Sequence, residues 1–154
     1  MSKELDTKLL DRLIDRASKG TVTARIGYFD DSGAHPRTKK TAGDIATINN
    51  NGAPKANIPE RPFVTDGAYE GEIGTRNAMV AGYEKFQRGQ TDLKTSLRKA
   101  AEVQKFRINQ KLQEAPFVYK ENAPYTEEKK GFNRPLLETG WLEEKIDIKV
   151  YEGD

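Results

Sequence analysis

Apolar residues recur with a helical period at the start of the chain. Ser2 can cap such a helix at its first turn, and Gly20 is placed to end it. We therefore predict an amphipathic helix over residues 3–19. Its apolar stripe contains Leu5, Leu9, Leu10, Leu13, Ile14 and Ala17.

Two other segments alternate apolar and polar residues with a period of two, which is typical of half-buried β-strands. They span residues 21–28 and 145–151. We predict that Ile26 and Ile148 are buried, because each lies mid-strand on the apolar side. A sheet of two strands is only marginally stable in water, so we expect further pairings. Their source is left open among residues 30–40, 62–70 and 116–120, or another subunit.

Three more helices are predicted between these strands. Residues 41–44 read Thr-Ala-Gly-Asp, a capping-box pattern ahead of a short helix over residues 42–50. Longer apolar stripes predict helices over residues 75–88 and 92–113, separated by Gly89. The order of elements predicts a single α+β domain in which a small, mainly antiparallel sheet packs against several helices.

Prolines limit the extent of the predicted helices. Pro54, Pro59 and Pro62 each remove a backbone donor and restrict the preceding residue. We therefore predict that residues 53–73 form an extended, proline-bearing loop or arm.

The region before the last strand is also interrupted by prolines, at Pro116, Pro124 and Pro135. After them, Trp141 and Leu142 supply a large apolar surface within a turn and a short helix. We expect this pair to pack into the core.

The composition bounds the class of protein. With 154 residues the chain fits one domain, 1–154. It has 26 Lys and Arg residues against 24 Asp and Glu, and the net charge of +2 gives little reason to expect a nucleic-acid partner. The absence of cysteine excludes disulfides and thiolate metal sites and favours a cytosolic origin. We expect no signal peptide and no membrane span, because no apolar run is long enough.

Side chains that carry catalysis are sparse in this chain. His35 is the only histidine and lies in a loop-like sequence, so a metal site or a serine triad would have to depend on it alone. The acidic pairs, such as Asp30 with Asp31, are adjacent in sequence, and adjacent side chains diverge. The glycines form no nucleotide-binding motif. We therefore expect no enzyme activity, no cofactor and no metal site.

The helix predicted over residues 92–113 carries a candidate basic face. Six basic residues against three acidic residues leave a net charge of about +3 there. Such a surface can contact DNA phosphates, although the solvated face of a long helix is the plainer interpretation. Val103 and Phe106 fall off its main apolar stripe, which suits a subunit interface. The basic residues are Lys94, Arg98, Lys99, Lys105, Arg107 and Lys111.

Residues 58–63 read Ile-Pro-Glu-Arg-Pro-Phe, in which two prolines hold the backbone extended around an arginine. Arg61 has a planar fork that can hold a carboxylate or carbonyl, and Phe63 can fill a pocket. Two interpretations are open: a surface that joins subunits, or a proline-bounded entry into the next element. The candidate assembly interface consists of Ile58, Pro59, Arg61, Pro62 and Phe63.

Two further motifs follow the 58–63 segment in a fixed order. Residues 122–126 read Asn-Ala-Pro-Tyr-Thr, and residues 135–142 read Pro-Leu-Leu-Glu-Thr-Gly-Trp-Leu. With the first strand and the helix that ends at Gly52, these motifs give a chain that resembles the tail-completion or neck proteins of tailed bacteriophages. The resemblance covers most of the chain after residue 20.

The resemblance implies a structural subunit of the virion, assembled in the host cytoplasm, that forms a ring at the head–tail junction. Such a neck ring completes or terminates the tail and joins it to the head. The implied partners are copies of the chain in a hexameric or dodecameric ring, a head connector, adaptor or head-closure protein, and the tail tube protein. DNA would pass through the lumen without sequence recognition, and no cofactor or membrane would be needed. The alternative function is a small DNA-binding module that uses the basic helix.

The chain departs from the family pattern at two places. Asn50 and Asn51 precede Gly52 where relatives often carry an acidic and an aromatic residue, and residues 64–66 replace a common Leu-Arg continuation. Both departures concern contacts with partners more than the fold.

Overall fold

A computed structural model describes residues 21–122, 124, 127–128, 131, 136 and 140–153. The helix predicted over residues 3–19 lies outside these residues. The described elements are β1 (Val22–Tyr28), η1 (Asp30–Ser32), α2 (Ala42–Asn51), η2 (Pro54–Ala56), α3 (Phe63–Gln87), α4 (Leu93–Val118), α6 (Trp141–Lys145) and β2 (Ile146–Glu152).

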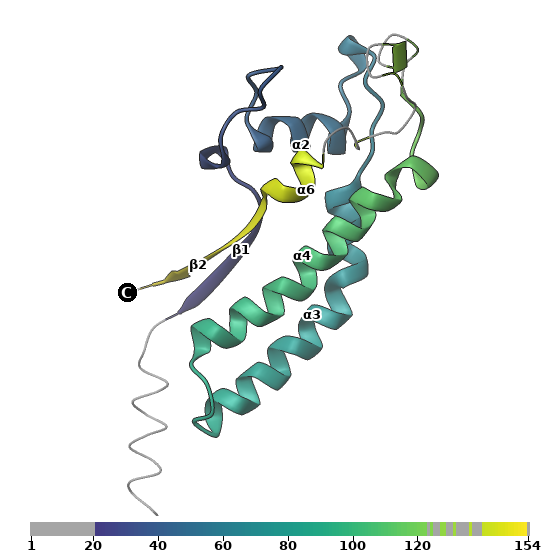
Figure 1. Cartoon of the computed structure of the whole chain (residues 1–154). Coiled ribbons are helices and arrows are strands. Elements are labelled where there is room, and N and C mark those ends of the chain that lie inside the picture. Colours follow the sequence, from purple (N-terminus) through teal and green to yellow (C-terminus); the bar gives the residue numbers. More distant parts are fainter. Residues whose placement is uncertain are drawn as a thin grey trace, which may run out of the picture.

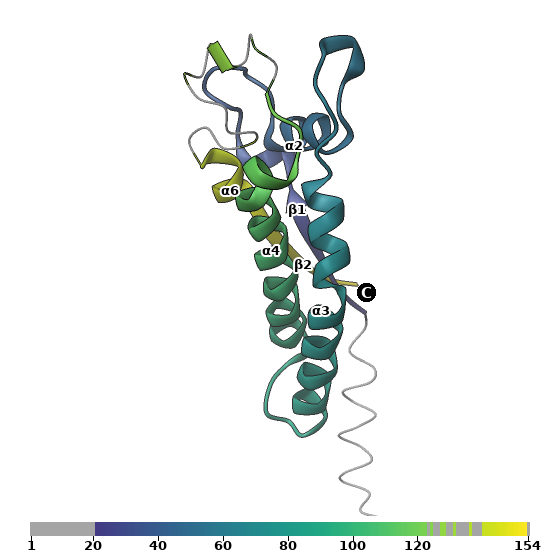
Figure 2. The same cartoon turned by 90° about the vertical axis from the view of Figure 1, so that its right-hand side faces the viewer.

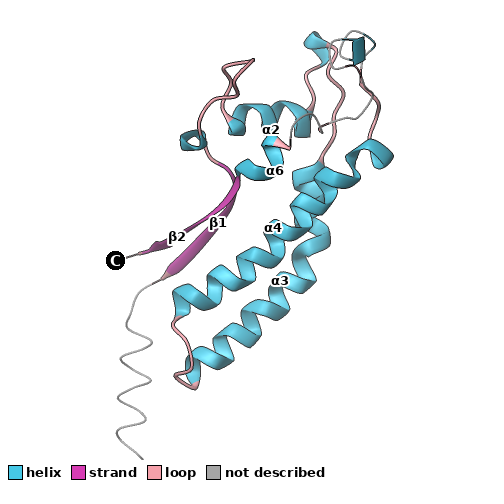
Figure 3. Cartoon of the chain, viewed as in Figure 1, coloured by secondary structure: helices cyan, strands magenta, loops and turns pink. Residues whose placement is uncertain are grey.

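The two long helices, α3 and α4, form a hairpin that runs most of the length of the molecule (Figures 1 and 3). Helices α2 and α6 gather near one end of this hairpin, and the β1–β2 ribbon extends from there on one side of it. We call this end the junction end, and the end with the α3–α4 connection the turn end. The arrangement confirms the predicted α+β class.

The sheet consists of β1 and β2 in antiparallel pairing, with Ile26 opposite Ile148. Both predicted strands are confirmed. Ile148 is buried as predicted, whereas Ile26 is only half-buried. The expectation of further strands in this chain is wrong for the described residues. Residues 63–70 and 116–118 are helical instead, and α4 packs against both strands, so a helix gives the ribbon the support that a third strand would give.

Helix α2 begins with the capping box predicted from the sequence. The Thr41 hydroxyl accepts a hydrogen bond from Asp44 N at 3.1 Å, and Thr41 N donates to Asp44 Oδ2 at 3.3 Å. The helix ends at Gly52, whose φ of 71° favours glycine. Local sequence therefore fixes both ends of α2.

Helix α3 starts twelve residues earlier than the sequence predicts, so the second half of the expected 53–73 loop or arm is helical. Pro62 stands just before the first turn, where a backbone donor needs no helical partner, and so it does not oppose the helix. The first donors are met from α2, because the Asn50 side-chain oxygen accepts from Val64 N at 3.0 Å and from Thr65 N at 3.3 Å. Asn50 of α2 therefore caps α3.

Helix α4 extends past its predicted end at residue 113 and includes Pro116. The proline lies in the last turn, so few later residues depend on the hydrogen bonds that it disturbs. Ala115 on that turn and Leu112 on the turn before it are both buried, and their packing supports the helix through to Val118. The predicted boundary at Gly89 between the two long helices is confirmed.

Glycines allow α3 and α4 to approach closely, and Figure 2 shows the two helices side by side. A Cβ atom added at Gly67 would lie 2.6 Å from Ile108 Cα, and one at Gly82 would lie 2.9 Å from Ser96 Cβ. Gly71 faces the Gln104 side chain in the same way. Gly67 therefore lies against the backbone of α4, whereas Gly71 and Gly82 make room for its side chains.

The hydrophobic core lies at the junction end, where four helices and the ribbon meet. Phe63 from α3 and Leu112 from α4 are the largest fully buried side chains together with Ile146 from β2. Trp141 packs against this cluster and Leu142 is part of it, as the sequence predicts. The other buried members are Ala46 and Ile108.

Candidate assembly surfaces

Arg61 of the 58–63 segment is buried, with 4% of its surface exposed. Its Nε donates to the carbonyl oxygen of Lys120 at 2.9 Å, and its Nη2 donates to that of Glu121 at 3.0 Å. A longer bond of 3.4 Å joins Nη2 to Asn122 Oδ1. Burial lowers the pKa of the guanidinium, and these oxygen acceptors offset the cost of removing the charge from water. Arg61 therefore fastens the segment to the chain that follows α4.

Phe63 is fully buried, and its ring meets the Tyr28 ring edge-on with the centroids 6.0 Å apart. The prediction that Arg61 and Phe63 face a neighbouring subunit is therefore wrong, because both are enclosed by their own chain. The other interpretation of this segment, a proline-bounded entry into the next element, is confirmed by the start of α3 at Phe63.

The rest of the segment is less enclosed. Ile58 and Pro59 are half-buried, and with Glu60 they line a cleft of about 870 Å³ whose lining also includes Tyr119. Pro62 is also half-buried. The structure therefore divides the predicted interface into a buried anchor and a partly exposed ledge.

The six basic residues of α4 do not form one face. A helix turns by about 100° per residue, so Lys99 lies about 140° around the axis from Lys94, and Lys111 lies about 100° in the other direction. The charges are also partly compensated, because Lys94 Nζ lies 3.7 Å from a Glu152 carboxylate oxygen. Of the remaining three, Arg98 and Arg107 are exposed and Lys105 is partly exposed.

Lys111 shows the strongest compensation among these basic residues. Its Nζ lies 2.7 Å from Glu70 Oε1 and 3.0 Å from Glu114 Oε2. Hydrogen bonds to these two carboxylates raise the pKa of the ammonium group. Lys111 therefore ties α4 to α3 and is a poor candidate for a phosphate contact.

The His35 side chain contacts its own loop and Trp141. Its Nδ1 accepts from Arg37 N at 3.3 Å and from Thr38 N at 3.4 Å, and its ring meets the Trp141 ring edge-on at 4.9 Å. The described residues hold no cluster of three or more side chains suited to a metal ion. Within the same ranges, none of the helices combines the length and the hydropathy that crossing a bilayer requires.

A surface that the sequence reasoning missed lies on α3. Tyr69, Ile73 and Val80 are 79%, 72% and 56% exposed. Positions four and seven residues apart share one side of a helix, and this side is opposite to the glycines that face α4. We call Tyr69, Ile73 and Val80 the outer stripe. The signal was present in their spacing, but the first two fall in the region assigned to a loop or arm.

Comparison with known proteins returned no matching family model, curated protein or solved structure. The resemblance to tail-completion or neck proteins therefore stays a prediction that depends on the sequence motifs.

Proposed function

We propose that the protein is a structural subunit that assembles with copies of itself into a ring at the neck of a tailed-phage virion. In this role it completes or terminates the tail and joins it to the head connector or head-closure protein. The motif order implies this setting and the partners, including the tail tube protein. The observation that carries the proposal of self-assembly is the outer stripe.

The outer stripe places large apolar side chains where a monomer would normally place polar ones. Helix α3 has its small residues, Gly67, Gly71 and Gly82, toward α4, and beyond the core residue Phe63 it exposes large apolar residues on the other side. A surface helix usually has the opposite arrangement. Aromatic and aliphatic side chains gathered on one exposed face are typical of a protein interface.

The stripe is long enough for a helix-sized contact. Tyr69 and Val80 are eleven residues apart, or about 16 Å along the helix axis. In a closed ring each subunit contacts its neighbour through two different surfaces. The outer stripe supplies one of them, and the ledge of Ile58 and Pro59 is available for another contact.

The test is the mass of the assembled protein and its dependence on the outer stripe. We expect light scattering to give a mass of several subunits and negative-stain images to show rings. Tyr69→Ser with Ile73→Ser should reduce the mass toward that of one chain without changing the circular dichroism. Tyr151→Ser, at an exposed position on β2, is the matched control and should assemble normally.

Two outcomes would contradict the proposal: a wild-type protein that stays monomeric at high concentration, or an oligomer that the double substitution leaves intact. Binding of the monomer to duplex DNA with a strong salt dependence would instead support the DNA-binding alternative.

A further inference from the structure

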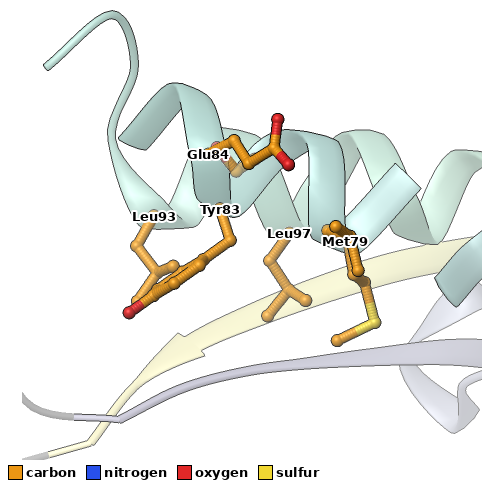
Figure 4. Close-up of a pocket in the computed structure, with 7 residues that line it drawn as sticks. Met79, Tyr83, Glu84, Leu93 and Leu97 are labelled. Atoms are coloured by element: carbon orange, nitrogen blue, oxygen red, sulfur yellow. The ribbon is translucent and has the colours of Figure 1, made fainter. Parts of the chain in front are cut away.

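A second apolar surface lies near the turn end of the hairpin. Met79 and Tyr83 from α3 and Leu93 and Leu97 from α4 line a groove of about 500 Å³. Their side chains project to the same side, whereas Glu84 projects to the other (Figure 4). We call these four residues the turn groove. Val80 of the outer stripe also lines this groove.

The turn groove is open although its lining is apolar. About half of the Met79 and Tyr83 side-chain surface is exposed, and Leu93 and Leu97 are only partly buried. The core at the junction end does not reach these residues, since its buried members lie on the other half of each helix. Covering exposed apolar area of this kind with another segment removes it from water and stabilises the folded protein.

The described chain begins beside this groove. Thr21 is the first described residue, and its carbonyl oxygen accepts from Gly153 N at 2.7 Å. The neighbouring Glu152 lies 3.7 Å from Lys94, which follows Leu93 of the groove. Residues 1–20 are therefore attached close to the groove wall that α4 supplies.

We propose that residues 3–19 form an amphipathic helix that docks its apolar stripe into the turn groove of the same chain. A helix of 17 residues is about 25 Å long, which is enough to cover the groove from a point of attachment at Thr21. Gly20 permits the change of direction that this docking needs. Six apolar residues on one helix also need a surface to bury them, and the groove supplies one of matching character.

Attachment at Thr21 favours the same chain over a second copy. A short connection keeps the local concentration of residues 3–19 at the groove high, at the millimolar level expected for short linkers. A neighbouring subunit would have to present its own segment at a comparable concentration. The test of the docking substitutes neither Tyr69 nor Ile73, so its failure can be told apart from a failure of the proposed ring.

Cross-linking between introduced cysteines tests the docking directly, because the natural chain contains no cysteine. Leu13→Cys with Leu97→Cys should give an intrachain link with a short bifunctional maleimide, seen as a shifted band of monomer mass on denaturing gels. Leu13→Cys with Lys40→Cys is the control, because Lys40 is exposed in the loop ahead of α2. We expect the yield of the first pair to exceed that of the control several-fold.

Removal of residues 1–19 gives an independent measurement. The shortened chain should bind more of an apolar dye than the full chain, and Leu97→Ser in the shortened chain should remove the gain. Circular dichroism confirms that each variant is folded. Links formed mainly between chains would show that a second copy fills the groove, and a yield equal to the control would show that residues 3–19 do not dock there. Either result overturns the proposal.

Discussion

The two ends of the α3–α4 hairpin differ in how far their apolar side chains are buried. At the junction end, α2, α6 and the ribbon enclose the hairpin, and large side chains such as Phe63 and Leu112 are fully buried. Toward the turn end, Gly82 of α3 faces Ser96 of α4 without a large buried side chain between them, and Met79 and Tyr83 remain exposed. The same pair of helices therefore supplies a stable core at one end and an uncovered apolar surface at the other.

Different residues of the same hairpin therefore serve stability and contacts with other segments. Substitutions at the junction end should act on the free energy of unfolding, whereas substitutions on the outer stripe or in the turn groove should act on contacts with other segments. The hairpin transmits the stability of the core to the exposed half, because a helix is cooperative along its length.

The largest effect expected is from Phe63→Ala, which removes a fully buried ring. We expect the free energy of unfolding to fall by about 3–5 kcal/mol, through lost burial and the cavity left behind. Urea unfolding followed by circular dichroism measures it. Tyr69→Ala on the same helix should change it by less than about 0.5 kcal/mol under conditions that keep the protein monomeric. Equal losses at both positions would remove the contrast between the buried core and the exposed outer stripe.

Arg61→Met tests whether the junction end depends on polar contacts as well as packing. The variant leaves the carbonyl groups of Lys120 and Glu121 without their Arg61 donors in a partly buried place. We expect a loss of about 2–3 kcal/mol in the free energy of unfolding. Arg61→Lys should recover only part of it, because an ammonium group cannot reproduce the geometry of the planar fork. Full recovery by lysine would show that charge alone matters here.

Gly67→Ala should push the helices apart, because its added Cβ would meet the backbone of α4 at 2.6 Å. We expect the free energy of unfolding to fall by about 1–3 kcal/mol. Gly74→Ala is the matched control, because its Cβ would meet only the side-chain Val103 Cγ1, at 3.2 Å. There the better helix propensity of alanine should balance or exceed the strain. Melting temperatures of the two variants measure this difference. Similar losses at both sites would argue against a contact between Gly67 and the backbone of α4.

Asp92 at the start of α4 should give the smallest effect, and one that depends on pH. Hydrogen bonds from Thr95, including its backbone N–H at 2.7 Å, hold the pKa of the Asp92 carboxyl below its usual range. A pKa lowered by folding adds stability above the unfolded value of about 3.9, and this is lost as the pH falls through the folded value. Asp92→Asn should therefore melt lower than the wild type at pH 7 and equally at low pH. A difference that is the same at every pH would contradict this account.

The elements that the sequence predicts well are those with local signals. The alternation in β1 and β2, the capping box of α2 and the break at Gly89 all operate within a few residues. The start of α3 could not be predicted in this way, because its cap comes from Asn50 in another helix. From the sequence alone, Pro62 predicts a break in regular structure, but with the cap from Asn50 it stands directly before the first turn of α3.

The candidate site was harder to predict than the fold, because exposure depends on distant partners. Arg61 looked like a surface clamp, but its acceptors lie about 60 residues further along the chain. Ile73 looked like part of an arm until α3 gave it an exposed helical position. The proposed function and its partners stay predictions for the same reason, since they concern surfaces outside the single chain.

The glycines of α3 fix how near the two helices lie, but they do not by themselves fix the register. Gly67 and Gly71 are one turn apart, so a slide of one turn would bring one glycine to the place of the other. Polar contacts prevent this slide. Gln104 Nε2 donates to the Gly67 carbonyl at 3.1 Å, and Ser96 Oγ donates to the Gly82 carbonyl at 3.1 Å. A one-turn shift would break both bonds together, so the two helices have a single alignment. The exposed side chains of α3 therefore keep fixed positions along the hairpin axis relative to those of α4.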